Sequence, residues 1–426
     1  MIENVSIKKP AASKNSPAGK PEERKRTGSK FFQTLLVPFL AILTGFIIGA
    51  VVIALSNDAV IASYRNLFHD PGTALAATWN AISVAYGSLF YGSFGSVAEI
   101  YHGIQTYYST GDSKAFLLAI YPFTESLTTV TPYILAGLAV AVGFKCGLFN
   151  IGAEGQFGVG ALASAFVGYA FHGPWYIHLP LAILAGAAAG ALWGAIPGLL
   201  KGLTGAHEVV TTIMMNYVSF RLSDWLLNGP MKAPGFRPLT PVIDNSAMLP
   251  QFFPDPLRLN WGFIIAIAIA FLVYWFLFKT PVGFEIRAVG ANPDGARYAG
   301  MNIVKNFVLA MTISGALAGL AGAVQVLGVD HWVGQGFSSG YGFDSIAIAL
   351  LGQSHPLGVV LAALLWGTLR SGATKMQITA GVPIEIISII QGLVIVFVAA
   401  PAVIRWIYRI RAISTQTTVL TRGWGK

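Results

Sequence analysis

The sequence predicts an all-α, polytopic membrane protein of about ten membrane segments, with interrupted helices among them. Of the 426 residues, 54% are hydrophobic and only 11% are charged, whereas a soluble protein is about 25% charged. The 48 glycines raise the non-polar share further. Several uncharged runs also reach the length of about 20 residues that a helix needs to cross a bilayer. This composition excludes a soluble enzyme, a nucleic-acid binder and a disordered scaffold.

The crossings are predicted from the apolar runs in chain order. They are Phe31–Leu55, Ser126–Gly143, Ile151–Phe171, Tyr176–Leu200, Val209–Leu227, Trp261–Phe278, Phe307–Leu327, Phe343–Leu351, Val359–Leu369 and Ile384–Trp406. Two of them are short, and Phe343–Leu351 cannot span alone. The first run has 25 uncharged residues, which exceeds the apolar core of a cleavable signal peptide, so we expect it to remain as an anchor.

Basic residues predict the orientation. Eight of the 27 Lys and Arg residues lie in the first 30 positions, and most of the others fall on the same side of the predicted crossings. Basic segments are retained in the cytoplasm, so we expect both termini to be cytoplasmic. The net charge of +9 is therefore interpreted as an orientation signal rather than as a nucleic-acid surface.

Composition also divides the chain into regions. The two ends, 1–30 and 407–426, are predicted cytoplasmic tails, and the first has so little hydrophobic content that we expect disorder. Between them lie the first transmembrane helix at 31–55, an extracytoplasmic or interfacial segment at 56–123, and a transmembrane domain at 124–406 that contains a cytoplasmic segment at 280–306.

The stretch Gly147–Ala161, GLFNIGAEGQFGVGA, places Asn150, Glu154 and Gln156 inside an apolar segment with five glycines. A charge near the bilayer centre costs roughly 2.5–3.5 kcal/mol on insertion scales, and glycines weaken a helix. Polar groups and helix breaking at one depth predict an interrupted helix that lines a polar path. The alternative is that Glu154 pairs with a neighbouring helix or backbone and only shapes the fold.

Three further polar residues are candidates for the same path. Glu208 and Asn216 lie two turns apart on roughly one helix face. Asp344 begins a short apolar run of the length typical of a re-entrant or broken helix. Each acid has a structural alternative: Glu208 as an ordinary first-turn charge, and Asp344 as a helix cap.

The sequence lacks three common motifs of ATP sites, metalloproteases and metal or redox cysteine pairs. It has no GxxxxGK[ST] loop for ATP, no HExxH and no CxxC. The single cysteine, Cys146, excludes an intramolecular disulfide and a multi-cysteine metal site. We therefore expect no catalytic residue, no metal site and no cofactor bound by this chain.

The segment Thr280–Asn306 is amphipathic and is broken at Asn292-Pro293, which favours a turn between two short helices. A short helix exposed on the cytoplasmic face is a natural contact for another protein. The alternative is a solvated connector.

Three motifs carry a family resemblance: FNIGAEGQ (Phe149–Gln156), GFEIRAVGANPDGARYAGM (Gly283–Met301) and GYGFDSIAIALLG (Gly340–Gly352). In this combination and order they resemble the membrane permease subunits of bacterial ABC importers. The group they resemble most is the nucleoside and simple-sugar permeases, which are related to the branched-chain amino-acid and ribose permeases. The resemblance runs from about Ser126 to the end of the chain.

The resemblance implies a helical permease in the bacterial cytoplasmic membrane that pairs with a second permease subunit. It also implies a cytoplasmic ABC ATPase that binds ATP and Mg²⁺, and an extracytoplasmic lipoprotein that delivers a small neutral solute, with a purine nucleoside as first choice. Gly283–Met301 would contact the ATPase through Gly283, Glu285, Arg287, Gly290, Asn292, Pro293, Arg297 and Gly300. Here Gly290 would allow close approach of the ATPase backbone.

Other functions remain open from the sequence. A simple sugar or riboflavin is the alternative substrate. A secondary ion-coupled transporter would need no ATPase and would use Glu154 and Glu208 as ion sites. A channel would need a selectivity filter, for which the sequence offers no convincing candidate.

Overall fold

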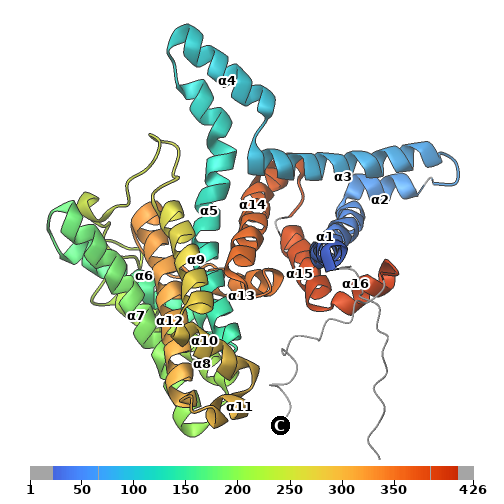
Figure 1. The fold of residues 1–426 in the computed structure, drawn as a ribbon. Coiled ribbons are helices and arrows are strands. Elements are labelled where there is room, and N and C mark those ends of the chain that lie inside the picture. Colours follow the sequence, from blue (N-terminus) through green and yellow to red (C-terminus); the bar gives the residue numbers. More distant parts are fainter. Residues whose placement is uncertain (1–22, 66, 384, 411–426) are drawn as a thin grey trace, which may run out of the picture.

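Helices make up the secondary structure of the computed structural model, which describes residues 23–65, 67–383 and 385–410 (Figure 1). In the first third of the chain they are α1 Glu23–Ser56, α2 Asp58–Tyr64, α3 Pro71–Phe94, α4 Val97–Thr110 and α5 Lys114–Lys145. The middle of the chain holds α6 Ala153–Ala170, α7 Trp175–Thr204, α8 Glu208–Asn228, the 3₁₀ turn η1 Asn245–Ala247, α9 Gly262–Lys279, α10 Pro281–Ala291 and α11 Pro293–Tyr298. The last part of the chain holds α12 Ile303–Gln325, the short π-helix η2 Val326–Asp330, α13 Tyr341–Leu351, α14 Pro356–Ala380, α15 Glu385–Ala399 and α16 Pro401–Ile407.

Six of these helices are long and apolar enough to cross a membrane, or seven spans if the bent pair α15–α16 counts as one. The chain is therefore a multi-pass helical membrane protein, but the expected number of about ten crossings is not confirmed. The reason is local: α6 and α8 carry polar residues that lower their hydropathy, and α13 has only 11 residues. All three helices nevertheless pack within the described bundle.

The structure describes only a small part of the two expected tails. Helix α1 begins at Glu23, inside the region expected to be disordered. Residues 1–22 and 411–426, which hold most of both predicted tails, lie outside the described residues. Segment 56–123 is helical, and α3 lies across the ends of the bundle helices in Figure 1.

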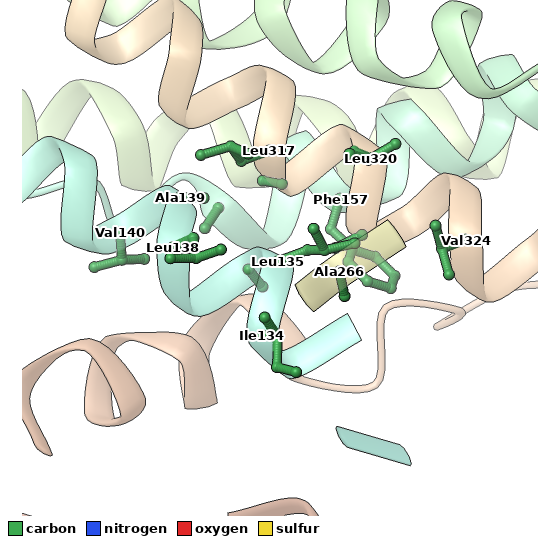
Figure 2. Close-up of a cluster of buried hydrophobic side chains, with 14 of the residues drawn as sticks. Ile134, Leu135, Leu138, Ala139, Val140, Phe157, Ala266, Leu317, Leu320 and Val324 are labelled. Atoms are coloured by element: carbon green, nitrogen blue, oxygen red, sulfur yellow. The ribbon is translucent and has the colours of Figure 1, made fainter. Parts of the chain in front are cut away.

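Helix α5 is the central helix of the bundle. In the most apolar stretch of 18 residues in α5, 83% of the residues are buried, as expected for a helix that is hydrophobic on all sides. Figure 2 shows part of the core around it, where side chains from α5, α6, α9 and α12 meet. The connection between α8 and α9 and the pair α10–α11 lie at opposite ends of this bundle (Figure 1).

Helices α7 and α12 pack backbone against backbone. Glycines recur at every fourth residue of α7, at positions 186, 190, 194, 198 and 202, and form one stripe along the helix. A Cβ atom at Gly190 would overlap the carbonyl oxygen of Gly315, and one at Gly319 would overlap that of Gly186. Small residues at this spacing let membrane helices approach closely, so the stripe holds α12 in a fixed position on α7.

Candidate functional site

The short helix α13 begins inside the bundle, where its first N–H groups need acceptors. The carboxylate of Glu154, near the start of α6, supplies them. Its Oε1 accepts from the N–H of Gly340 at 3.0 Å, and its Oε2 accepts from those of Gly342 and Phe343 at 2.6 and 3.3 Å. Glu154 is only 3% exposed, so it is paired with backbone, as the structural alternative for this residue expected.

Asp344, in the first turn of α13, connects this helix to two neighbouring helices. Its Oδ2 accepts a hydrogen bond from the Tyr133 hydroxyl at 2.7 Å and forms an ion pair with Arg370 at 3.0 Å. Arg370 also donates to the carbonyl of Ser339 at 3.2 Å. Asp344 thus ties α13 to α5 and α14 and does not cap its own helix, whose first N–H groups are bound by Glu154 instead.

Amide side chains hold the turn that enters α6. Asn150 donates to Gln156 and to the Ser314 hydroxyl, both at 2.8 Å, and accepts from the Gly152 N–H at 2.9 Å. Asn150 is fully buried and Gln156 nearly so. These bonds position α6 against α12. The expected place of Asn150 and Gln156 along a substrate path stays a prediction.

Asn216 and Glu208 lie at separate places on α8. Asn216 accepts from the N–H of Gly155 at 2.8 Å and donates to the carbonyl of Ile151 at 3.0 Å, so it supports the same turn. Glu208 forms an ion pair with Lys201 at 2.8 Å, at the junction of α7 and α8. Of the six predicted path residues, the structure gathers all except Glu208 around α6 and the start of α13.

A pocket of about 360 Å³ opens beside this assembly, between α6, α8 and the segment 333–340. Its size falls within the range of small-molecule sites, about 300–1,000 Å³. The lining combines aromatic rings with hydroxyl, amide and acidic groups: Glu154, Gly158, Ser219, Phe220, Ser223, Asp224, Val333, Gly334, Gln335, Gly336, Phe337, Ser338, Ser339 and Gly340. Aromatic rings and hydrogen-bonding groups together suit a flat, polar, uncharged ligand.

Segment 333–340 forms one wall of the pocket, and the connection between α8 and α9 holds the start of this wall in place. The N–H of Thr240 donates to the carbonyl of Val333 at 2.9 Å, and the Thr240 hydroxyl accepts from the N–H of Val333 at 3.0 Å. An isolated bridge joins Leu239 to Gly334. The wall therefore rests on the α8–α9 connection at one end and on Glu154 at the other.

The segment α10–α11 contacts its own chain at the positions expected to face a partner. A Cβ atom at Gly290 would overlap the carbonyl oxygen of Lys145, and it would lie 2.8 Å from the backbone nitrogen of Gly147. The glycine thus lets the α5–α6 turn of its own chain approach α10 closely. The expected close approach of the ATPase backbone at Gly290 stays a prediction. Arg287 is also engaged, since its Nε donates to the carbonyl of Leu277 at 2.9 Å and its guanidinium lies over the Phe278 ring.

The other predicted contact residues divide into internal and exposed ones. Gly283 packs on the end of α9, and Glu285 accepts from Asn306 at 3.1 Å. Asn292 caps α11, which begins at Pro293, and Gly300 follows that helix with a φ of +83°. Arg297 is exposed, and so are two side chains of this segment that were not among the predicted contacts, Tyr298 (97% exposed) and Phe284 (55%). These three are free to meet a partner.

Replacing Gly290 with tryptophan is expected to detach α10 from the α5–α6 turn in the isolated protein. The measurement is limited proteolysis of segment 280–306 in detergent, and cleavage should be at least several times faster than in the wild type. Ala291→Trp is the matched control, because Ala291 is exposed and a tryptophan side chain at this position has room. An unchanged cleavage rate in Gly290→Trp would show that the contact between α10 and the α5–α6 turn does not require a glycine at position 290.

Several residues of the site were missed from the sequence. Arg370 had a signal, since it is a lone charge after the apolar run Val359–Leu369. Tyr133, Phe337 and Asp224 had none, because an aromatic ring or an acid near a helix end is common and only the fold brings these residues to α13 or to the pocket.

Comparison with known proteins gives one family match. The model of "Branched-chain amino acid transport system / permease component" matches residues 123–399. The chain is 40% identical to the guanosine ABC transporter permease protein NupP of Bacillus subtilis, over 88% of this chain and 95% of that protein. It is 34% identical to the nucleoside ABC transporter permease protein NupB of Lactococcus lactis, over 87% and 92%. The glucose ABC transporter permease protein TsgB13 of Haloferax volcanii is 36% identical over 66% and 77%. No solved structure matches.

Proposed function

This chain belongs to the branched-chain amino acid transport system / permease component family, and we propose that it is the permease subunit of an ATP-driven importer that carries nucleosides across the bacterial cytoplasmic membrane. The observation that carries the proposal is the pocket between α6, α8 and segment 333–340. Phe220 and Phe337 offer aromatic surface to a nucleobase, and serine hydroxyls offer partners to a ribose. Relatives named for guanosine and nucleosides, matched over most of the chain, support the same substrate class.

The proposal includes three protein partners. A cytoplasmic ABC ATPase, which holds ATP and Mg²⁺, would dock on α10–α11 through Phe284, Arg297 and Tyr298, which are exposed. The contacts of Gly283, Glu285, Arg287 and Gly290 with their own chain would pass its motion to the α5–α6 turn. An extracytoplasmic lipoprotein would deliver the substrate at the opposite end of the bundle.

The third partner is a second permease subunit, which we place on α8. This helix exposes Arg221 and Asp224, with side chains that are 87% and 42% exposed. Charged groups on a membrane helix face a protein or a water-filled cavity far more often than lipid. A second subunit on this face would close the pocket and complete a polar path.

Uptake by cells that express the permease with its ATPase and lipoprotein tests the substrate class. Labelled guanosine uptake is expected to be inhibited by unlabelled nucleosides and not by glucose or riboflavin. It is also expected to stop when the P-loop lysine of the ATPase is replaced by alanine. Inhibition by glucose or riboflavin but not by nucleosides would overturn the nucleoside assignment, and transport by the purified permease in liposomes without ATPase would overturn the importer.

A further inference from the structure

The two carboxylates that line the pocket, Glu154 and Asp224, differ in how many hydrogen bonds they can still accept from a ligand. Glu154 is buried and both of its oxygens are occupied by the N–H groups at the start of α13. Asp224 projects from α8, and its side chain is 42% exposed. Only one of these two acids can therefore bind a substrate without breaking the fold, and it is Asp224.

Asp224 is oriented by a neighbour across the pocket. The amide Nε2 of Gln335 donates to its Oδ1 at 3.0 Å, which links α8 to segment 333–340. Its Oδ2 faces Arg221 at 3.5 Å, and the Arg221 side chain is 87% exposed and so free to turn away. An ionised carboxylate has about four acceptor positions on its two oxygens. Both oxygens of Asp224 therefore keep acceptor capacity for a ligand in the pocket.

The neighbours of Asp224 suit a planar base. Phe220 lies four residues before it on α8, one helical turn away, and Phe337 comes from the facing segment; both line the pocket. A base stacked against either ring presents its edge, not its face, to the surrounding polar groups. The group at that edge then decides which bases are accepted.

We propose that Asp224 is a specificity-determining residue that accepts hydrogen bonds from a base with two adjacent donors on its edge, as in a guanine nucleoside. The N1–H and the amino group of guanine are parallel donors that match the two oxygens of a carboxylate. Adenine presents an acceptor beside its amino donor, which leaves a lone pair facing the Asp224 oxygens. This inference rests on the proposed function and names the feature of the substrate that the pocket reads.

Exchange of Asp224 for asparagine tests the inference, because it replaces one acceptor with a donor at nearly unchanged volume. The readout is the ratio of maximal uptake rates for guanosine and adenosine at saturating concentrations, with the same lipoprotein in every strain. A hydrogen bond to a charged group typically decides between partners by about tenfold or more. The ratio in Asp224→Asn is therefore expected to move at least tenfold toward adenosine.

Two further variants control the measurement. Asp224→Glu keeps both acceptors and is expected to retain the guanosine preference. Asp58→Asn removes an exposed acid in the first turn of α2 and is expected to change neither rate. The amount of permease in the membrane is measured for each strain and used to normalise the rates.

The outcomes separate the inference from the function on which it rests. If wild-type cells take up guanosine and Asp224→Asn keeps the wild-type ratio, the role of Asp224 is wrong while the importer stands. If no nucleoside is transported by the wild type, the proposed function fails first. If Asp224→Asn does not reach the membrane, Asp224→Ser provides the same comparison, since it also removes the carboxylate, and an unchanged ratio in that variant overturns the inference.

Discussion

Replacing Gly190 with leucine is expected to prevent the folded protein from accumulating in the membrane. Even a Cβ atom at this position would overlap the backbone of α12 at Gly315, so the side chain has no direction in which to turn. Gly190→Ala should already lower stability, since overpacking typically costs about 1–3 kcal/mol. The measurements are the amount of protein in the membrane fraction and the midpoint of thermal unfolding of the purified protein in detergent.

Gly87→Ala is the matched control for this experiment. Gly87 lies inside α3, and a Cβ atom there would have no neighbour within 4 Å. Alanine favours a helix over glycine by up to about 1 kcal/mol, so this variant should accumulate normally and unfold at the same or a slightly higher temperature. Wild-type accumulation and stability of Gly190→Leu would show that α7 and α12 are not in backbone contact.

Replacing Glu154 with leucine is expected to abolish transport. It would leave the N–H groups of Gly340, Gly342 and Phe343 without their acceptor, and that of Gly342 is buried. An unsatisfied buried donor costs about 1–3 kcal/mol, so the start of α13 and the adjoining pocket wall should give way. Glu154→Gln should retain part of the activity, because one amide oxygen still accepts while the amino group faces a donor.

Uptake rate per permease molecule in the membrane is the quantity to compare. Glu385→Gln is the control, since Glu385 is an exposed acid in the first turn of α15. We expect the order wild type, Glu385→Gln, Glu154→Gln, Glu154→Leu, with the first two equal. Full activity in Glu154→Leu would mean that α13 holds its place without the carboxylate.

Much of the fold could be predicted because hydrophobic length is a local property. The runs beginning at Phe31, Trp261 and Phe307 each overlap a helix that is long and apolar enough to cross a membrane. The number of crossings could not be predicted where a helix is both long and polar. Glu154, Gln156 and Ser164 of α6 are buried inside the protein, so they lower the hydropathy of the helix without preventing it from packing in the bundle. Hydropathy cannot distinguish a polar residue buried inside the protein from one that faces lipid.

The sequence predicted that Glu154 is a central residue of the site, but it did not predict which groups Glu154 contacts. Glu154 stood out because an acid among glycines inside an apolar run is costly unless it has partners. Its partners are backbone N–H groups nearly two hundred residues further along the chain. Every residue except proline has such a group, so the pattern of side chains in the sequence cannot indicate which of them Glu154 binds. Gly290 shows the same limit, since a glycine needed for close approach looks the same whether the approaching backbone belongs to the ATPase or to Lys145.

The position of Glu154 also determines which ionic state of a solute the pocket tolerates. The N-terminus of a helix carries a partial positive charge and commonly holds phosphate through its free N–H groups. At α13 this place is already filled by the protein's own carboxylate, and Asp224 adds a second negative charge nearby. A nucleotide would meet repulsion at the one location that would otherwise bind its phosphate, whereas an uncharged nucleoside would not. The same arrangement would disfavour the escape of the cell's phosphorylated metabolites through the path of the importer.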